Sequence, residues 1–276
     1  MRITLLVWAL LFGSLSCASL ASELQFSSKN GATNLTQLEI LKLPAVTVSV
    51  QDPTRGKRVE YTGIEINAVL TQQFGEMWNQ ASEIVFTCAD GYQPSIPVSV
   101  LKQHRAILAY GQPGKPQFET IVRSNGQIVD PGPYYLVWDT DNDPKLSDED
   151  WISWPWQITT IELLFGGERY PLAVPPTDSG DKVQKGFLAF RQHCIKCHSL
   201  NGEGTGVAPE LNYPMSVTEY WQPEWLERFI LNPQSVRYNS KMTAFYAGLA
   251  NKEERVKEIV SYLKIMAQHK KLNTKQ

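Results

Sequence analysis

The chain has 276 residues, of which 42% are hydrophobic and 20% are charged, and its formal net charge is -2. Because one hydrophobic core serves roughly 100 to 200 residues, this length predicts two domains. The near-neutral charge argues against a nucleic-acid-binding protein, which needs a basic surface to displace counterions from phosphates, and the chain carries no polybasic membrane patch. A partner must therefore recognise a local surface and not the bulk charge.

The N-terminus, residues 1–21, has the pattern of a secretory signal peptide. Arg2 provides the positive charge, residues 3–12 are an apolar run, and Ser19-Leu20-Ala21 resembles a small-residue cleavage site. Spanning a bilayer takes about 20 apolar residues, so this run is too short, and we expect cleavage after Ala21 and a periplasmic protein. An uncleaved signal anchor and a lipoprotein acylated at Cys17 are the alternatives, and either would bring membrane contact.

Residues 22–176 are predicted to form a strand-rich α+β domain. Short apolar runs separated by Gly, Pro, Asn and Asp turns predict its strands. Two helices are expected, at residues 65–74 and 98–104. The expected strands are residues 45–50, 84–87, 107–110, 134–138 and 158–165.

Three segments of this domain resemble successive pieces of the molybdopterin-binding domain of the sulfite oxidase type. They are YTGIEINAVL (61–70), FTCADGYQPSIPVSVL (86–101) and AILAYGQPGKP (106–116). The resemblance implies that an active member holds molybdenum through a cysteine thiolate upstream of the segment 61–63, but no cysteine occurs between Ser22 and Thr62. Because function depends on sites and not on folds, we expect a reduced relative without the molybdopterin cofactor.

Two further features of this domain have ordinary explanations. Cys88, in an apolar strand, is expected to be a small buried hydrophobe and not a reactive thiol. The acidic stretch 139–150 spaces its aspartates like a calcium-binding loop, but Pro144 stands where that loop needs glycine. We expect a solvated acidic turn, with docking of a basic partner as the alternative.

A polar, proline-led segment at residues 174–181 places the predicted domain boundary near residue 177, so that the second domain is 177–276. Without the signal peptide the chain keeps Cys88, Cys194 and Cys197, an odd number that argues against a disulfide framework. Cys194 and Cys197 form a Cys-x-x-Cys motif followed directly by His198. This motif predicts one covalent haem c, whose vinyl groups take the two thiols and whose iron takes His198 as proximal ligand.

The same cysteine pair has two other interpretations. A thioredoxin-like redox pair is expected near a βαβ pattern, and half of a zinc site is expected with a second pair of ligands. The sequence shows neither context.

Residues around the motif have helical spacing. Gly186, Phe190 and Cys194 recur every four residues and therefore share one helix face, on which Gly186 permits the close approach of another helix. The expected partner is the last helix, with Asn251 as N-cap and Glu254 three residues later. Its apolar face is Val256, Ile259, Val260, Tyr262, Leu263 and Met266. A third helix is expected from Pro223 to Asn232-Pro233, carrying Trp225, Leu226, Phe229 and Ile230.

The second axial ligand of the iron is predicted to be Met242, which follows the loop 232–237. A thioether ligand raises the reduction potential relative to two histidines. Met215 competes for this role. His193, in the attachment turn, and His269, near the C-terminus, are weaker candidates.

Residues 186–268 resemble a class I cytochrome c, because four segments occur in the order expected of that family. They are GFLAFRQHCIKCH (186–198), APEL (208–211), EWLERFILNPQSV (224–236) and KMTAF (241–245). The resemblance implies that the carbonyl of Pro209 accepts the other N–H of His198 and orients the ligand. Two departures occur, since Ala208 replaces the family's glycine and Thr243 replaces the proline that usually follows the methionine.

Together these features predict a periplasmic electron-transfer protein that is more a carrier or subunit than an enzyme. Its haem passes single electrons between a partner dehydrogenase and a downstream acceptor, and the N-terminal domain docks a redox partner. One alternative is a haem-containing oxidoreductase whose N-terminal domain retains a molybdopterin-type cofactor. Another is a haem-based ligand sensor, which needs an open or labile sixth position on the iron.

Overall fold

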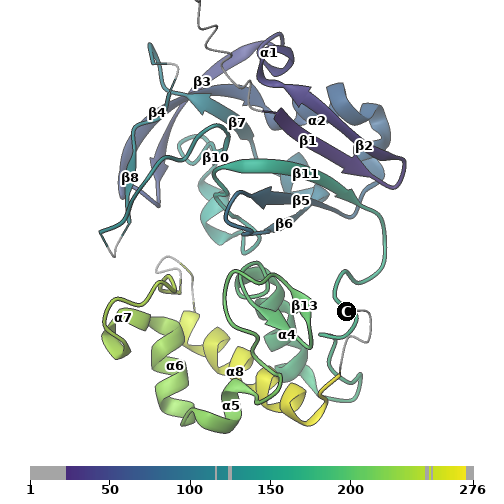
Figure 1. Cartoon of the computed structure of the whole chain (residues 1–276), viewed down its shortest axis with the longest axis vertical. Coiled ribbons are helices and arrows are strands. Elements are labelled where there is room, and N and C mark those ends of the chain that lie inside the picture. The colour runs from purple at the N-terminus through teal and green to yellow at the C-terminus, as the bar shows by residue number, and fades with distance from the viewer. Residues whose placement is uncertain (1–22, 116, 124–125, 246–248, 250, 272–276) are drawn as a thin grey trace, which may run out of the picture.

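The computed structural model describes residues 23–115, 117–123, 126–245, 249 and 251–271. Figure 1 shows a strand-rich part formed by the first portion of the chain and a helical part that follows it. The predicted α+β and all-α classes are therefore confirmed. The predicted signal peptide and Cys17 lie outside the described residues. Among the helices described, none combines the length and the apolar character that crossing a membrane requires.

A five-stranded sheet forms one layer of the N-terminal part, in the order β2-β1-β11-β5-β6. Strands β1 and β11 are parallel, and the other neighbours are antiparallel. The strands are β1 (Glu23–Ser28), β2 (Gly31–Thr36), β5 (Glu83–Cys88), β6 (Ser95–Pro97) and β11 (Ile158–Leu164). The predicted strands at 84–87 and 158–165 are thus confirmed. The hairpin β1–β2 was not predicted, because β2, with the sequence GATNLT, has no apolar alternation and is largely exposed.

A four-stranded antiparallel sheet has the order β10-β7-β4-β3. Side chains alternate between its faces, so Ile64 and Leu108 enter a core shared with the first sheet, while Tyr61 and Ile107 enter a second cluster on the other face. With both faces covered, β7 and β10 are apolar runs, which is why the sequence predicted them. The strands are β3 (Ala45–Asp52), β4 (Lys57–Glu65), β7 (Ala106–Gly111) and β10 (Tyr135–Trp138).

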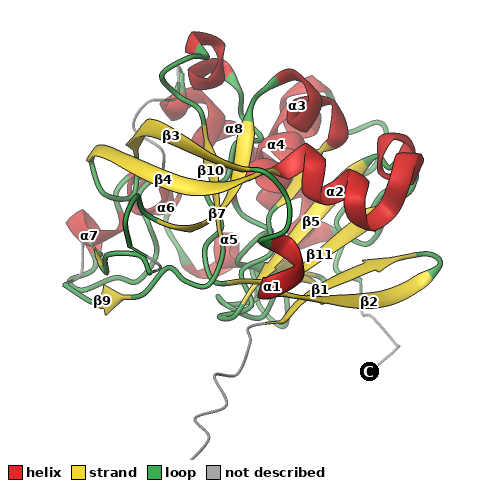
Figure 2. Ribbon diagram, turned by 90° about the horizontal axis from the view of Figure 1, so that it is seen from above, coloured by secondary structure: helices red, strands yellow, loops and turns green. Residues whose placement is uncertain are grey.

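Short helices cover the N-terminal sheets. Helices α2 (Ile66–Phe74) and α3 (Val98–Gln103) confirm the two predicted helices, and α2 packs against β4 and β7. Figure 2 shows α2 lying over the strands of this part. The remaining elements are α1 (Gln37–Ile40), two 3-10 helices (Gly75–Gln80 and Pro144–Asp148) and the hairpin β8 (Ile121–Val122) and β9 (Ile128–Val129).

The helical part is centred on the crossing of α4 (Asp181–His193) and α8 (Lys252–Gln268). A Cβ atom on Gly186 would lie 2.1 Å from the carbonyl oxygen of Glu258, so only glycine permits this close approach. The predicted partner helix is therefore confirmed, and all six residues of its predicted apolar face are buried. The other elements are β12 (Ser199–Leu200), β13 (Glu203–Gly204), α5 (Val217–Tyr220), α6 (Pro223–Leu231) and α7 (Pro233–Val236).

Two local expectations in this part need correction. Asn251 precedes α8 as predicted, but its left-handed backbone (φ 55°) leaves its side chain without a capping hydrogen bond among the described residues. The loop predicted at 232–237 contains the short helix α7. The predicted third helix corresponds to α6, on which Leu226 is buried and Trp225 is 49% exposed, because adjacent residues of a helix point in different directions and only one face meets the core.

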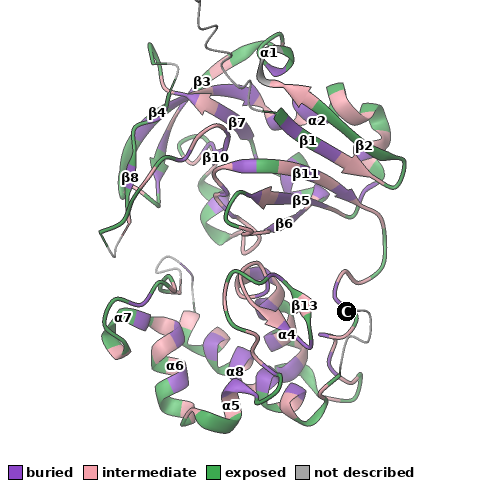
Figure 3. Cartoon of the chain, in the orientation of Figure 1, coloured by how far each residue is buried: buried purple, intermediate pink, exposed green. Residues whose placement is uncertain are grey.

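Each part has its own hydrophobic core, as the burial colouring of Figure 3 illustrates. Tyr170 and Ala173 belong to the core of the helical part. The hydroxyl of Tyr262 donates to the carbonyl of Ala173 (2.5 Å), and the amide of Leu172 donates to the Glu203 carboxylate (2.6 Å). The chain therefore joins the packing of the helical domain several residues before the predicted boundary near residue 177.

Candidate haem site

The Cys-x-x-Cys-His motif forms a tight turn at the C-terminal end of α4. The amide of Cys194 still donates to the carbonyl of Phe190 (2.8 Å), in continuation of the helix. The amides of Cys197 and His198 both donate to the carbonyl of Cys194, at 3.0 and 2.9 Å. The turn thus holds two thiols and one imidazole within five residues, and both thiols are free.

The imidazole of His198 is oriented from one side. Its Nδ1 lies 2.7 Å from the carbonyl oxygen of Pro209, the contact that the family resemblance implied. This bond leaves Nε2 as the nitrogen that can bind iron. The amide of Ala208 donates to the carbonyl of Cys197 (2.8 Å), so alanine at this position does not prevent the loop from closing on the motif. Burial lowers the pKa of His198, which keeps the ring in the neutral form that ligates a metal.

The loop that presents Pro209 is itself held by Glu210. The Glu210 carboxylate accepts hydrogen bonds from the backbone amides of Asn201 (2.9 Å), Gly202 (3.1 Å) and Asn212 (2.9 Å). This carboxylate joins the turn between β12 and β13 to the proline segment. The orientation of His198 therefore depends on a small network and not on a single carbonyl.

The environment of the two thiols does not fit a thioredoxin-like redox pair. Such a pair needs a thiolate stabilised by a depressed pKa, often at a helix N-terminus. Here burial raises the pKa of Cys194 to about 12 and also raises that of Cys197. Both residues follow a helix C-terminus, whose negative dipole end opposes a thiolate. Across the described ranges no group of three or more His, Cys, Asp or Glu residues could hold a metal ion, so no zinc site is found there either.

The candidates for the second axial ligand differ in their packing. Met242 is half-buried and packs against the core of the helical domain, and its amide donates to the hydroxyl of Ser240 (3.3 Å). Met215 is 57% exposed. A ligand to a shielded iron has to reach the interior, so the packing favours Met242.

The two other histidine candidates, His193 and His269, have different surroundings. The ring of His193 meets that of Phe245 edge to face at 4.8 Å, and its buried Nε2 has no hydrogen-bond partner within the described part of the chain. Burial, with Lys196 and Arg255 adding to it, lowers the pKa of His193 to about 3. His269 follows the end of α8, where its amide donates to the carbonyl of Met266 (2.9 Å).

Residues of the N-terminal domain, which sequence reasoning did not place near the motif, lie against the attachment turn. The carbonyl of Lys196 accepts from the amide of Gln93 (3.0 Å), and the Lys196 ammonium donates to the hydroxyl of Ser153 (3.1 Å). The Asp90-Gly91-Tyr92 turn lies in the segment 86–101, for which the sequence indicated only a family resemblance. Gln93 and Ser153 are both distant from Lys196 in the sequence, and no local sequence pattern could have revealed either contact.

The acidic stretch 139–150 is exposed over part of its length, including Asp148, as predicted for a solvated turn, but other aspartates in it pair with basic side chains. Three of its aspartates pair with arginines from elsewhere in the chain and Asp143 contacts His104, which reduces the free charge available to a basic docking partner. The pairs are Asp139 with Arg105 (2.8 Å), Asp141 with Arg58, Asp143 with His104 (2.5 Å) and Asp150 with Arg255 (2.6 Å). Cys88, in contrast, is 4% exposed, as expected for a buried hydrophobe, and burial raises the pKa of its thiol.

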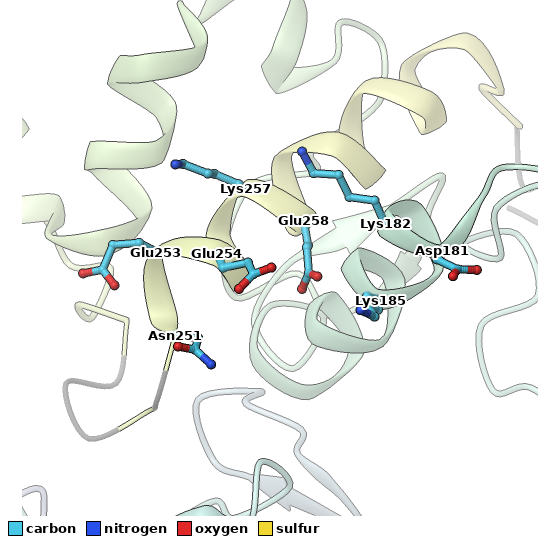
Figure 4. Close-up of a pocket in the computed structure, with 8 residues that line it drawn as sticks. All are labelled: Asp181, Lys182, Lys185, Asn251, Glu253, Glu254, Lys257 and Glu258. Atoms are coloured by element: carbon cyan, nitrogen blue, oxygen red, sulfur yellow. The ribbon is translucent and has the colours of Figure 1, made fainter.

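A hollow lies between the N-terminal ends of α4 and α8. Figure 4 shows that it is lined by four acidic side chains, three lysines and Asn251. The mixed charges compensate one another, and no aromatic, cysteine or histidine side chain is among the lining residues. Because Cys194 lies at the opposite end of α4, this hollow is separate from the haem site.

Comparison with known proteins identifies one family. Residues 183–267 match the Cytochrome c family. Among solved structures, the chain is similar to the sulfane dehydrogenase SoxCD from Paracoccus pantotrophus, with a TM-score of 0.35 and 13% sequence identity over 54% of this chain. The match covers 40% of that protein's chain. A likeness at this level does not decide the activity of the N-terminal domain.

Proposed function

Since residues 183–267 are a cytochrome c domain, we propose that the chain is a periplasmic electron-transfer protein with one covalent haem c. It passes single electrons between a partner dehydrogenase and a downstream acceptor. Cys194 and Cys197 attach the haem, His198 is the proximal ligand and Met242 is the second axial ligand. The observation that carries the proposal is the hydrogen bond from His198 Nδ1 to the Pro209 carbonyl, which fixes the ring with Nε2 left for iron.

The donor set fits this cofactor. Two thiols, one oriented imidazole and one thioether are the groups that covalent attachment and six-coordination require, and the haem supplies a one-electron couple when bound. The buried faces of α4 and α8 form an apolar core against which Cys194 packs. With His198 and Met242 as the two axial ligands, the iron has no open position for a substrate or gas ligand. This supports an electron carrier over a ligand sensor.

The N-terminal domain is proposed to act without a molybdopterin. Its cysteine, Cys88, sits inside the core with a raised pKa and is a poor metal ligand in that state. Metal analysis of the purified mature protein tests this point. We expect iron without stoichiometric molybdenum, whereas one molybdenum per chain would favour the alternative, a haem-containing oxidoreductase.

Export is proposed from the N-terminal sequence. The predicted cleavage after Ala21 is tested by the intact mass of the protein purified from the periplasmic fraction of its host. A mature N-terminus at Ser22 supports a free periplasmic protein. A lipid-modified N-terminus at Cys17 would replace it with a membrane-tethered one, and a cytoplasmic protein retaining residues 1–21 would contradict export.

A further inference from the structure

The haem-attachment turn is covered by a specific segment of the N-terminal domain. Lys196, between the two cysteines, makes two contacts with that domain, one through its carbonyl to the amide of Gln93 and one through its ammonium to Ser153. Ser153 is 5% exposed, so the second contact is well shielded from water. The segment Asp90–Gln93 therefore lies directly on the attachment turn.

The fit between this segment and the cytochrome domain is close. Gly91 has a left-handed backbone (φ 87°), and a Cβ atom there would lie 3.1 Å from Cγ2 of Val207. The segment is held by its own hydrogen bonds, because the amide of Tyr92 donates to the Asp90 carboxylate (3.0 Å) and the amide of Cys88 to the carbonyl of Tyr92 (2.9 Å).

A second contact lies on α4. Arg191 donates two hydrogen bonds to the Glu83 carboxylate at the start of β5 (2.8 and 3.0 Å) and one to Glu168 (3.2 Å). Its guanidinium also lies over the ring of Trp151, 5.6 Å from the centroid. The side chains of Arg191 and Glu83 are only 11% and 15% exposed. Removal of the arginine would leave a poorly solvated carboxylate without its partner.

A third contact lies on α8, where Arg255 pairs with Asp150 at 2.6 Å. The contacts thus come from three separate places on the cytochrome domain, namely α4, the attachment turn and α8. A single contact would allow the domains to rotate about it, whereas contacts at three places on the cytochrome domain restrict that rotation. Domains in one chain are otherwise expected to move against one another.

From this geometry we infer that the N-terminal domain is a fixed cover of the haem-attachment turn, docked through Asp90–Gln93, Glu83 and Asp150, and not a separately moving domain. The inference rests on the proposed function in that the covered turn carries the haem. It adds that redox partners approach the haem from a side other than the Cys197 side of the turn. It also implies that the cover contributes to the reduction potential by limiting contact of the haem with water.

The test compares the variant Arg191→Gln/Arg255→Gln with the control Arg105→Gln. Arg105 also bridges two carboxylates, those of Glu65 (2.6 Å) and Asp139 (2.8 Å), but both belong to the N-terminal domain. Hydrogen exchange is measured on a peptide that contains Gln93, because the backbone amide of Gln93 donates a hydrogen bond to the Lys196 carbonyl across the interface. The radius of gyration and the midpoint potential are measured on the same samples.

We expect the double variant to exchange faster at Gln93, to expand and to show a lower midpoint potential, because water stabilises the oxidised haem. The control should resemble the natural protein in all three. The inference would be overturned if the double variant kept the exchange rate at Gln93, the radius of gyration and the midpoint potential of the natural protein. It would also be overturned if scattering of the natural protein showed two domains that move independently. The haem spectrum separates the two proposals, since loss of the cover leaves the haem attached, whereas absence of covalent haem contradicts the proposed function itself.

Discussion

The two domains differ in whether the polar side chains considered below are hydrogen-bonded within the fold. In the N-terminal domain the carboxylate of Asp52 is satisfied within the domain, since it is fully buried and accepts from the hydroxyls of Tyr61 (2.5 Å) and Tyr135 (3.2 Å). In the cytochrome domain, the thiols of the motif and Nε2 of His198 are left uncommitted by the fold. A binding site is where side chains keep bonding capacity that the protein itself does not satisfy.

The largest effect that sharpens this comparison concerns the cysteines. We expect Cys194→Ser/Cys197→Ser to lose covalent haem completely, because no thiol is left to attach the vinyl groups. Cys88→Ser should keep a full complement of haem, since Cys88 is enclosed in the other domain. Denaturing gels stained for haem measure both. Loss of haem in the Cys88 variant, with its folding intact, would contradict the division of roles.

The next effect is on the reduction potential. Met242→Ala should lower the midpoint potential and make the reduced form bind carbon monoxide, because the thioether is lost and the sixth position opens. Met215→Ala serves as the control, as Met215 is 57% exposed and does not belong to the core. Potentiometric titration with visible spectroscopy reads both changes. If Met215→Ala gave the shift and Met242→Ala did not, the ligand assignment would be wrong.

A smaller effect is expected on stability at the helix crossing. Gly186→Ala should destabilise the cytochrome domain by about 3 kcal/mol, because the new methyl group collides with the Glu258 backbone and the helices must separate. At Gly206 a Cβ atom would meet open space, so Gly206→Ala should change the free energy of unfolding little. Denaturant unfolding followed at the haem absorbance compares the two. Equal stabilities would show that the crossing is not tight.

The smallest effect is a pH dependence that belongs to the cytochrome domain. The folded pKa of His193, about 3, lies below its usual value of 6.5, so the unfolded chain binds the proton more readily. Its contribution to stability is therefore present above pH 6.5 and is lost as the pH falls toward 3, at up to about 1.4 kcal/mol per pH unit. His193→Phe should show a shallower loss between pH 6.5 and 4.5 in denaturant unfolding. An identical slope would mean that His193 is not buried as a neutral ring.

Sequence reasoning succeeded where the signal is local. The spacing of Gly186, Phe190 and Cys194 predicted the face of α4, and the apolar period of residues 256–266 predicted that of α8. The turn 194–198 and the Pro209 carbonyl are near in sequence, so a short motif and a family resemblance were enough to suggest their arrangement. In each case the interaction joins residues on one helix or within a short loop.

Sequence reasoning failed where partners are distant in the chain. The ion pairs of the acidic stretch 139–150 were not predicted, because Arg58, Arg105 and Arg255 are remote from it in sequence. The contact of Gln93 with Lys196 joins two domains and has no periodicity that could reveal it. The strand β2 was missed for a different reason, since its exposed and polar side chains carry no hydrophobic pattern.

The central claim is that one haem is held covalently by Cys194 and Cys197. It is tested most directly by the intact mass of the mature protein purified from its native host, recorded together with its visible spectrum. We predict a mass equal to the chain from Ser22 plus one haem, retained after denaturation, and a reduced spectrum typical of a c-type cytochrome. A denatured mass that equals the polypeptide alone would contradict the claim.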